Sequence, residues 1–155
     1  MSKTNDTPEM TDEDREYEQY EKDCERLRAE NKKHLSAFEK WLTDSGLAKK
    51  TIKAHLENAE FYISHYLLRD DGDCEARNIP DGAWHVGGFF DWCIYKSILW
   101  SADSVRKMGG SLKKFYLFML EQGIVTQDDY DDLKETIKDG MEDWLDTINN
   151  GRGDW

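Results

Sequence analysis

The stretch SADSVRKMGGSLKKFYLFMLEQG, residues 101–123, decides the fold class of this chain. Its apolar residues recur at intervals of three and four positions, which places them on one face of an α-helix. The residues on that face are Val105, Met108, Leu112, Phe115 and Met119. Ser101 is a typical N-cap, and Gly123 is typical of the residue that follows a helix C-terminus. We therefore predict an amphipathic helix between these two residues.

The same spacing predicts helices on both sides of this stretch. We expect them to cover residues 35–42, 51–67, 86–99 and 127–148. The segment 86–99 is apolar on nearly all sides, which is typical of the central helix of a bundle. Residues 70–82 are rich in Asp and Gly, so we expect a loop there. Strand-like alternation is absent, and we predict an all-α fold, a compact bundle of four to five helices.

Charge is distributed unevenly along the 155 residues, whose formal net charge is −12. Residues 1–31 contain 5 basic and 11 acidic side chains, residues 32–125 contain 13 and 12, and residues 126–155 contain 3 and 10. The acidity therefore belongs to the two ends, and the middle is nearly neutral. We expect an acidic, partly helical N-terminal arm over residues 1–31, a helical bundle domain over 32–148 and a disordered tail over 149–155.

The composition also limits the class of protein. Aromatic residues make up 12% of the chain, which is too many for a disordered polyelectrolyte. No apolar run approaches the ~20 residues of a membrane span, and residues 1–9 lack a secretory pattern. We therefore expect a cytoplasmic protein with no membrane partner. Cys24, Cys74 and Cys93 have neither CxxC nor zinc-finger spacing, so we expect no disulfide framework, no metal and no cofactor.

A heptad stripe runs from the acidic N-terminal region into the first core helix. Its members are Tyr17, Tyr20, Cys24, Leu27, Asn31, His34, Phe38 and Trp41. One interpretation is a single long amphipathic helix whose early turns pack on the same domain. The other is a short coiled-coil dimer in which Asn31 sets the register. Two polar positions in the stripe weaken the coiled coil, so we favour a monomer.

Several short motifs together resemble a known family. They are Phe38-x-x-Trp41-Leu42, Gly46-Leu47, Thr51-Ile52, Ser104-Val105, the run from Ser111 to Phe118, and Gly123-Ile124. Over roughly residues 32–140, this pattern resembles the SAM-like N-terminal core-binding domain of tyrosine recombinases and phage integrases. The resemblance implies a SAM-like bundle, a role in binding DNA and an origin in a mobile element.

The same resemblance argues against catalysis by this chain. The family places its chemistry in a separate C-terminal domain with an Arg, a His-x-x-Arg pair and a nucleophilic Tyr. None of the four histidines, His34, His55, His65 and His85, has an Arg three residues further on, and we expect no such domain in this chain. We therefore expect no enzymatic activity. His55 and His65 lack a third ligand at helical spacing, and we interpret them as residues at the edge of the core.

Basic side chains near the starts of two expected helices are the candidate contacts to double-stranded DNA. In core-binding domains the equivalent helices face the duplex and grip its phosphates, which need cations or N–H donors. The candidates are Lys49, Lys50, Thr51 and Lys53 in one group, and Arg106, Lys107, Lys113 and Lys114 in the other. We expect them to gather on one side of the folded domain, although a solvated helix face balanced by acids is the alternative. Gly109-Gly110 lies inside the second helix, where close approach of DNA or helix packing would explain it; we favour packing.

Acidic residues near the C-terminus predict a different function. They are Asp128, Asp129, Asp131, Asp132, Asp139, Glu142, Asp143 and Asp146. Such a surface repels phosphate and suits a basic protein partner, so the alternative is a regulatory or inhibitory interaction module on the same fold. A third interpretation treats these residues as the ordinary solvent face of an amphipathic helix.

Overall fold

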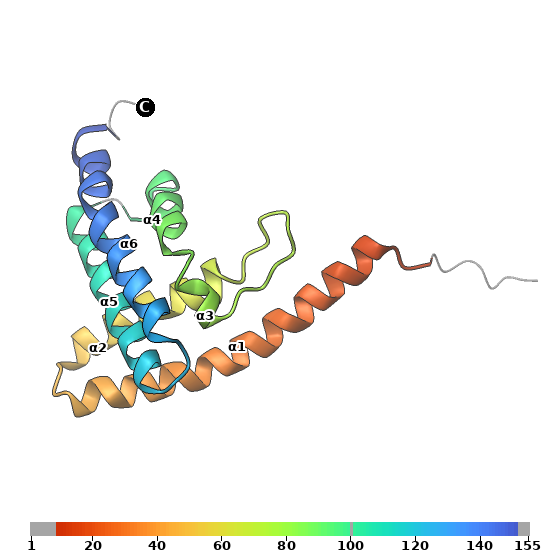
Figure 1. Ribbon diagram of the computed structural model, residues 1–155, viewed down its shortest axis with the longest axis horizontal. Coiled ribbons are helices and arrows are strands. Elements are labelled where there is room, and N and C mark those ends of the chain that lie inside the picture. The colour runs from red at the N-terminus through yellow and green to blue at the C-terminus, as the bar shows by residue number, and fades with distance from the viewer. Residues whose placement is uncertain (1–8, 100, 152–155) are drawn as a thin grey trace, which may run out of the picture.

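The structure is a computed structural model, which describes residues 9–99 and 101–151. Every regular element in these two ranges is helical, so the all-α prediction is confirmed (Figure 1). The elements are α1 (Asp12–Asp44), α2 (Lys49–Glu60), α3 (Ile79–Gly82), α4 (Val86–Tyr95), α5 (Ala102–Glu121) and α6 (Gln127–Asp146). Two π-helical turns, η2 (Phe61–Tyr66) and η3 (Thr147–Gly151), continue α2 and α6.

Helix α5 occupies the centre of the bundle, because α1, α2 and α6 all pack against it. It begins at a capping box in which Ser101 and Ser104 satisfy each other's backbone N–H groups. The apolar face predicted for this helix is buried, and Phe38 of α1 meets Phe115 edge-on at 5.1 Å between ring centroids. The helix predicted from residues 101–123 is therefore confirmed.

The most apolar helix, α4, lies at one flank of the bundle, so the prediction that it is central was wrong. It packs mainly on α6, where the rings of Phe90 and Trp144 stack at 4.3 Å. The helix also ends at Tyr95, before the predicted Leu99. Ser97 adopts a positive φ of 60°, which turns the chain so that two following N–H groups bond back to the Cys93 carbonyl.

The segment between α2 and α4 differs from its predicted form at both ends. The helix expected over residues 51–67 changes from α to π geometry after Glu60, and the Leu67 N–H bonds to the Tyr62 carbonyl five residues back at 3.0 Å. At the other end, part of the predicted loop forms the short helix α3. Asn78 caps this helix, and the buried Tyr116 hydroxyl donates to the Ile79 carbonyl at 2.8 Å.

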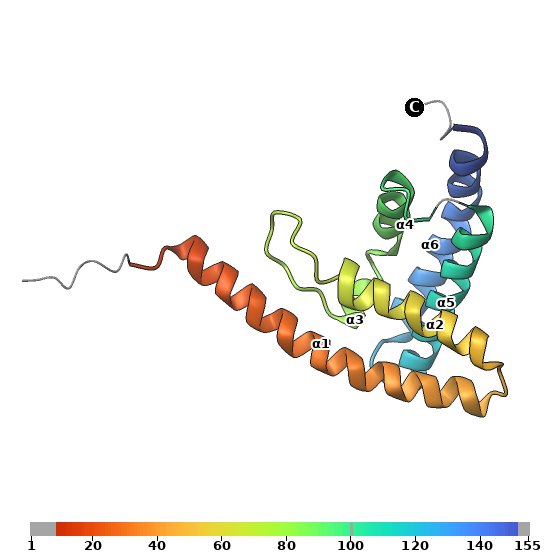
Figure 2. The same ribbon diagram turned by 180° about the vertical axis from the view of Figure 1, so that it is seen from behind.

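The heptad stripe belongs to one long helix, and its early turns are covered by the same chain. Tyr20, Cys24 and Leu27 pack on Leu68, and Asn31 Nδ2 donates to the Ile63 carbonyl at 3.1 Å. These contacts support the single-helix interpretation, and the monomer stays a prediction. α1 crosses the expected boundary at residue 31 without a break and extends beyond the bundle (Figures 1 and 2).

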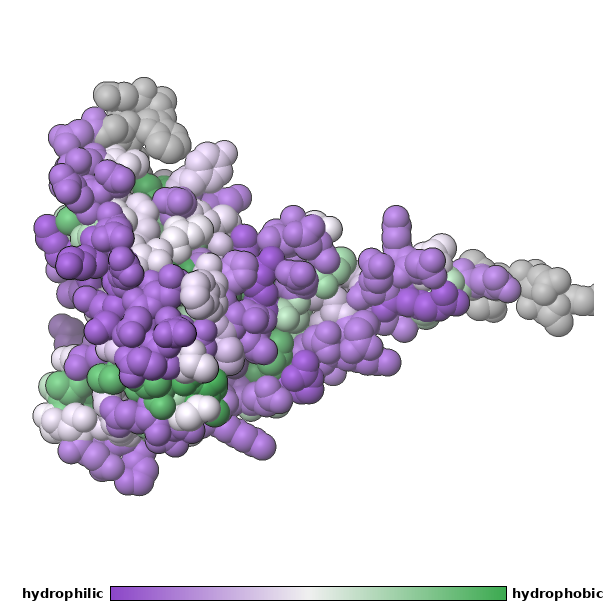
Figure 3. All heavy atoms as spheres, viewed as in Figure 1, coloured by the Kyte–Doolittle hydropathy of each residue, from purple (hydrophilic) through white to green (hydrophobic). Residues whose placement is uncertain are grey.

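The two ends of the chain lie only partly within this description. Residues 149–151, the start of the expected tail, belong to η3, and residues 1–8 and 152–155 fall outside the described ranges. The face in Figure 3 is mostly hydrophilic, with a narrow hydrophobic band where the α5–α6 turn meets α1. No helix within residues 9–99 and 101–151 is long and apolar enough to span a membrane.

Candidate nucleic-acid interface

Helices α2 and α5 lie side by side and enclose a groove of about 290 Å³. The two groups of predicted DNA contacts come from these two helices. The groove is lined by Lys50, Thr51, Ala54, His55 and Asn58 of α2, and by Lys107, Gly110 and Ser111 of α5. The structure therefore brings together part of each group, although they lie more than 50 residues apart in the sequence.

Among the residues that the structure describes, no acidic side chain lines this groove. Four other surface grooves in the described ranges each contain three or four carboxylates, as the total of 33 acidic residues would lead one to expect. Lys50 and Lys107 face the groove from opposite helices. Local potential depends on the charges near a surface rather than on the net charge, so this groove favours an anion.

Most of the predicted basic residues also lack an ion-pair partner. Lys107 Nζ lies 2.9 Å from Asp103 Oδ2, but both side chains are exposed, and such a pair contributes little stability. The other six form no ion pair with any residue that the structure describes, and all are exposed. They are Lys49, Lys50, Lys53, Arg106, Lys113 and Lys114. These charges remain available to a ligand.

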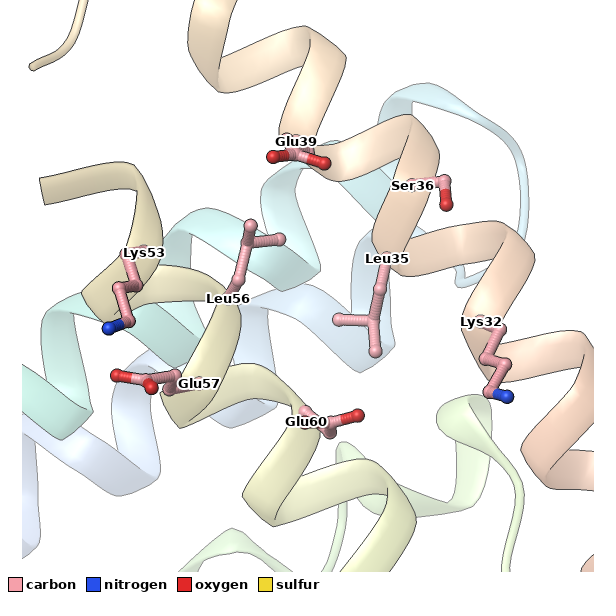
Figure 4. A pocket seen from close by; sticks show the side chains of 8 residues that line it. All are labelled: Lys32, Leu35, Ser36, Glu39, Lys53, Leu56, Glu57 and Glu60. Atoms are coloured by element: carbon pink, nitrogen blue, oxygen red, sulfur yellow. The ribbon is translucent and has the colours of Figure 1, made fainter. Parts of the chain in front are cut away.

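The eight predicted residues do not share one surface, so the expectation that they gather on one side was wrong. Lys53 lies on the opposite flank of α2, in a groove that also contains Glu57 and Glu60 (Figure 4). Lys113 lies between α5 and α6 in a groove that contains three carboxylates. Neighbouring positions on one helix point to different flanks, and the flanks meet different partners.

A polar network missed by the sequence analysis forms part of the groove. Ser111 Oγ lies 2.8 Å from His55 Nδ1 and accepts a hydrogen bond from Asn58 Nδ2 at 3.0 Å. Burial lowers the pKa of His55, and the charge of Lys114 lowers it further. His55 is therefore neutral near pH 7. The signal was present in the sequence, since Thr51, His55 and Asn58 share one helical face.

The glycine pair in α5 has two different environments. A Cβ on Gly109 would lie 3.2 Å from Ile137 Cγ2 and 3.3 Å from Met141 Cε, so the close packing of α6 explains this glycine. A Cβ on Gly110 would meet no atom within 4 Å. The packing explanation is right for Gly109 and wrong for Gly110, which opens into the α2–α5 groove.

The acidic residues of α6 are also of two kinds. Asp129 completes the cap of the helix and accepts a hydrogen bond from Trp84 Nε1 at 2.8 Å. The backbone hydrogen bond from Thr126 is the main cause that lowers the pKa of Asp129. Asp131 accepts a hydrogen bond from Gln127. Asp131 and Asp139 line the same groove as Lys113, Lys134 and Lys138. Asp132 is half-buried. Six of the eight predicted acidic residues are exposed and form no ion pair with any described residue, and they are Asp128, Asp131, Asp139, Glu142, Asp143 and Asp146.

Comparison with known proteins found no matching family model, no similar curated protein and no similar solved structure. The likeness to recombinase core-binding domains therefore stays a prediction from the motifs quoted above, as do the mobile-element origin and the cytoplasmic location. Within the residues that the structure describes, no three metal-ligating side chains converge on one point.

Proposed function

We propose that this protein is a non-catalytic DNA-binding module whose α2–α5 face contacts the sugar-phosphate backbone of a duplex. The single observation that supports this proposal most strongly is the composition of the groove. It combines lysines from two helices with no carboxylate from the described residues, in a chain whose net charge is −12. Phosphate groups are the abundant anions that such a surface would meet on DNA.

The start of α2 adds backbone donors to these cations. Its N-cap is Ala48, which offers no side-chain oxygen to the first N–H groups of the helix. Those N–H groups have no acceptor within the helix, lie beside Lys49 and Lys50 in the chain, and suit a phosphate oxygen. Contacts of this kind position the protein on the duplex and read little of its sequence. We therefore expect binding to many sequences, and a strong dependence on salt.

The expected salt dependence follows from the number of groove cations. Lys50 and Lys107 line the groove, and Lys114 lies close enough to lower the pKa of His55. Lys50 and Lys107 face one groove and Lys114 lies beside it, so two phosphate contacts give a log–log slope of about −1.8, since each contributes about −0.9. Affinity should then fall about 12-fold between about 50 and about 200 mM salt.

Fluorescence anisotropy of a labelled duplex with the full chain tests this proposal. The variant Lys50→Glu/Lys114→Glu should reduce the slope to about −0.9 and weaken binding at the lower salt. Its control is Lys22→Glu/Lys96→Glu, which makes the same change in net charge on the α1 extension and at the end of α4. Equal losses in both variants would show that only net charge matters. Absence of duplex binding by the unaltered chain at low salt would refute the proposal.

A second candidate function is supported by the last turns of α6. Glu142, Asp143 and Asp146 lie near its C-terminus, and no basic residue occupies the last turn. Negative charge is unfavourable at this end of a helix because of the helix dipole. A basic protein partner would relieve that repulsion. A lysine-rich peptide should then bind the full chain, and the triple amide variant at these three residues should lose that binding, while Asp12→Asn/Glu13→Gln/Asp14→Asn should retain it.

A further inference from the structure

We infer that the α2–α5 groove contains a seat for one phosphate group, which lies over Gly110 and is contacted by Lys50, Lys107 and Nε2 of His55. This inference rests on the proposed function and adds to it a defined position for one phosphate, two further residues (Gly110 and His55) and a linked proton. The groove volume of about 290 Å³ equals that of about ten waters, so one phosphate and its oxygens fit.

Gly110 is the first observation that points to this seat. Glycine in a helix interior is destabilising relative to alanine, so its presence requires a reason. Six glycines lie in the described α-helices, and for five of them a Cβ would come within 3.3 Å of another side chain. Gly110 alone opens onto empty space, and that space is the groove. A missing Cβ lets a ligand approach the helix backbone directly.

The charges around Gly110 are the second observation. Lys50 and Lys107 line the groove from opposite sides, and within the described part of the chain no carboxylate lines the groove beside them. Lys107 bonds to the exposed carboxylate of Asp103, but an exposed pair of this kind exchanges partners at little cost. A phosphate over Gly110 would therefore be contacted by a cation from each helix.

The fixed orientation of His55 is the third observation. Ser111 is buried and accepts a bond from Asn58, and we assign its hydroxyl proton to His55 Nδ1 because the described residues offer that hydroxyl no other acceptor within hydrogen-bond distance. In the neutral ring the proton then lies on Nε2, which can donate to a phosphate oxygen. In the protonated ring Nδ1–H donates to Ser111 and Nε2–H still donates to the phosphate. Both forms present a donor to the seat.

Phosphate binding should therefore be linked to proton uptake by His55. The charged groups that face this ring are Lys50 of α2 and Lys107 and Lys114 of α5. The groove on the other flank of α2 contains the remaining charged groups, which are Lys53, Glu57 and Glu60 of α2 and Lys32 and Glu39 of α1. Burial and Lys114 lower the pKa of His55 in the free protein, and a bound anion acts in the opposite direction. Duplex affinity should rise as pH falls through the titration range of His55, and a plot of log affinity against pH should show the uptake of at most one proton.

Two variants of the full chain test the seat by duplex anisotropy. Gly110→Ala adds one methyl group, meets no clash in the free protein, and should weaken binding about tenfold and reduce the salt slope by about 0.9. Ser36→Ala, an exposed helical position of α1, should leave both values unchanged. His55→Asn keeps an amide within reach of Ser111 but lacks a counterpart of Nε2, so it should abolish the pH dependence.

Competition with inorganic phosphate shows whether the seat binds the free ion as well as the phosphodiester of DNA. Displacement of the duplex by phosphate beyond that by chloride at equal ionic strength supports a seat that also takes the free ion. Displacement equal to that by chloride, together with the Gly110→Ala effect, supports a seat for the phosphodiester alone.

The seat and the proposed function can fail separately. Wild-type duplex affinity, salt slope and pH profile in both Gly110→Ala and His55→Asn would overturn the seat and leave DNA binding intact. If the unaltered chain does not bind duplex, the proposed function fails, and the seat is tested with inorganic phosphate by NMR of the His55 ring. Absence of a shift in that titration would overturn the seat as well.

Discussion

Gly109→Ala and Gly110→Ala add the same methyl group to adjacent positions of one helix, and we expect opposite effects on stability. Both replacements remove the conformational freedom of glycine from the helix interior, which stabilises the folded state by about 1 kcal/mol. Because this gain is common to both variants, the difference between them measures the environment of the added methyl group alone.

The structure predicts which of the two variants is more stable and by roughly how much. At Gly109 the methyl carbon would lie 3.2 Å from Ile137 Cγ2 and 3.3 Å from Met141 Cε, so α5 and α6 must separate slightly or their side chains must move. Overpacking of this kind costs about 1–3 kcal/mol. At Gly110 nothing lies within 4 Å, and the cost is absent. Gly110→Ala should therefore raise the free energy of unfolding by about 1 kcal/mol, and Gly109→Ala should lower it by up to about 2 kcal/mol.

Urea denaturation followed by tryptophan fluorescence measures both values, and an unchanged m-value shows that they are comparable. In a thermal scan, Gly110→Ala should raise Tm by about 2–4 °C for a chain of this length. A Gly109→Ala variant as stable as Gly110→Ala would refute the packing argument. A destabilised Gly110→Ala would show that the groove is filled in the free protein, which would contradict the seat as well.

Three further predictions concern the contacts that fix the bundle. Asn31→Ala removes two hydrogen bonds from α1 to η2 and leaves buried groups unpaired, so urea denaturation should show a loss of about 1–3 kcal/mol. Tyr116→Phe removes the buried hydrogen bond to α3 and should cost about 1–2 kcal/mol in the same assay, without a change in α-helical circular dichroism. Stability should fall as pH drops below about 6.5, because burial lowers the pKa of three histidines and the unfolded chain then binds protons first. They are His34, His55 and His85, and a flat profile between about pH 7 and pH 5 would contradict this assignment.

The parts of the fold that depend on neighbours in sequence could be predicted. Helix α5 and helix α6 each begin at a capping box, formed by residues three positions apart, and their apolar faces repeat within a few turns. Three features could not be predicted in this way. They are the extent of the π turn, the presence of α3 and the residue at which α4 ends. α3 has a local cap in Asn78, but it is also held against α5 by the Tyr116 hydroxyl, which donates to the Ile79 carbonyl 37 residues away. Such a bond exists only after the helices have packed.

The sequence predicted which types of residue form the candidate site, but not which individual residues lie in it. Lysines at helix starts were evident in the sequence, yet Lys50 and Lys53 face different flanks of α2. Which flank meets α5 depends on how the two helices cross. His55 and Ser111 are 56 positions apart, and their contact fixes the ring only in the folded bundle. The spacing in the sequence predicted that His55 lies at the edge of the core, and the structure agrees. It did not predict the contact with Ser111.

The acidic ends of the chain should limit DNA binding only when salt is very low. At physiological salt the Debye length is about 8 Å, so the groove lysines are screened from distant carboxylates. At about 10 mM salt the Debye length is about 30 Å, and the α1 extension and α6 then repel a duplex on the α2–α5 face. The log–log plot of affinity against salt should thus be linear at about 50–200 mM and should flatten towards 10 mM. Replacing Glu142, Asp143 and Asp146 by amides should restore linearity, because α6 adjoins α5. A plot that is already linear down to about 10 mM would show that the acidic ends do not act on this face.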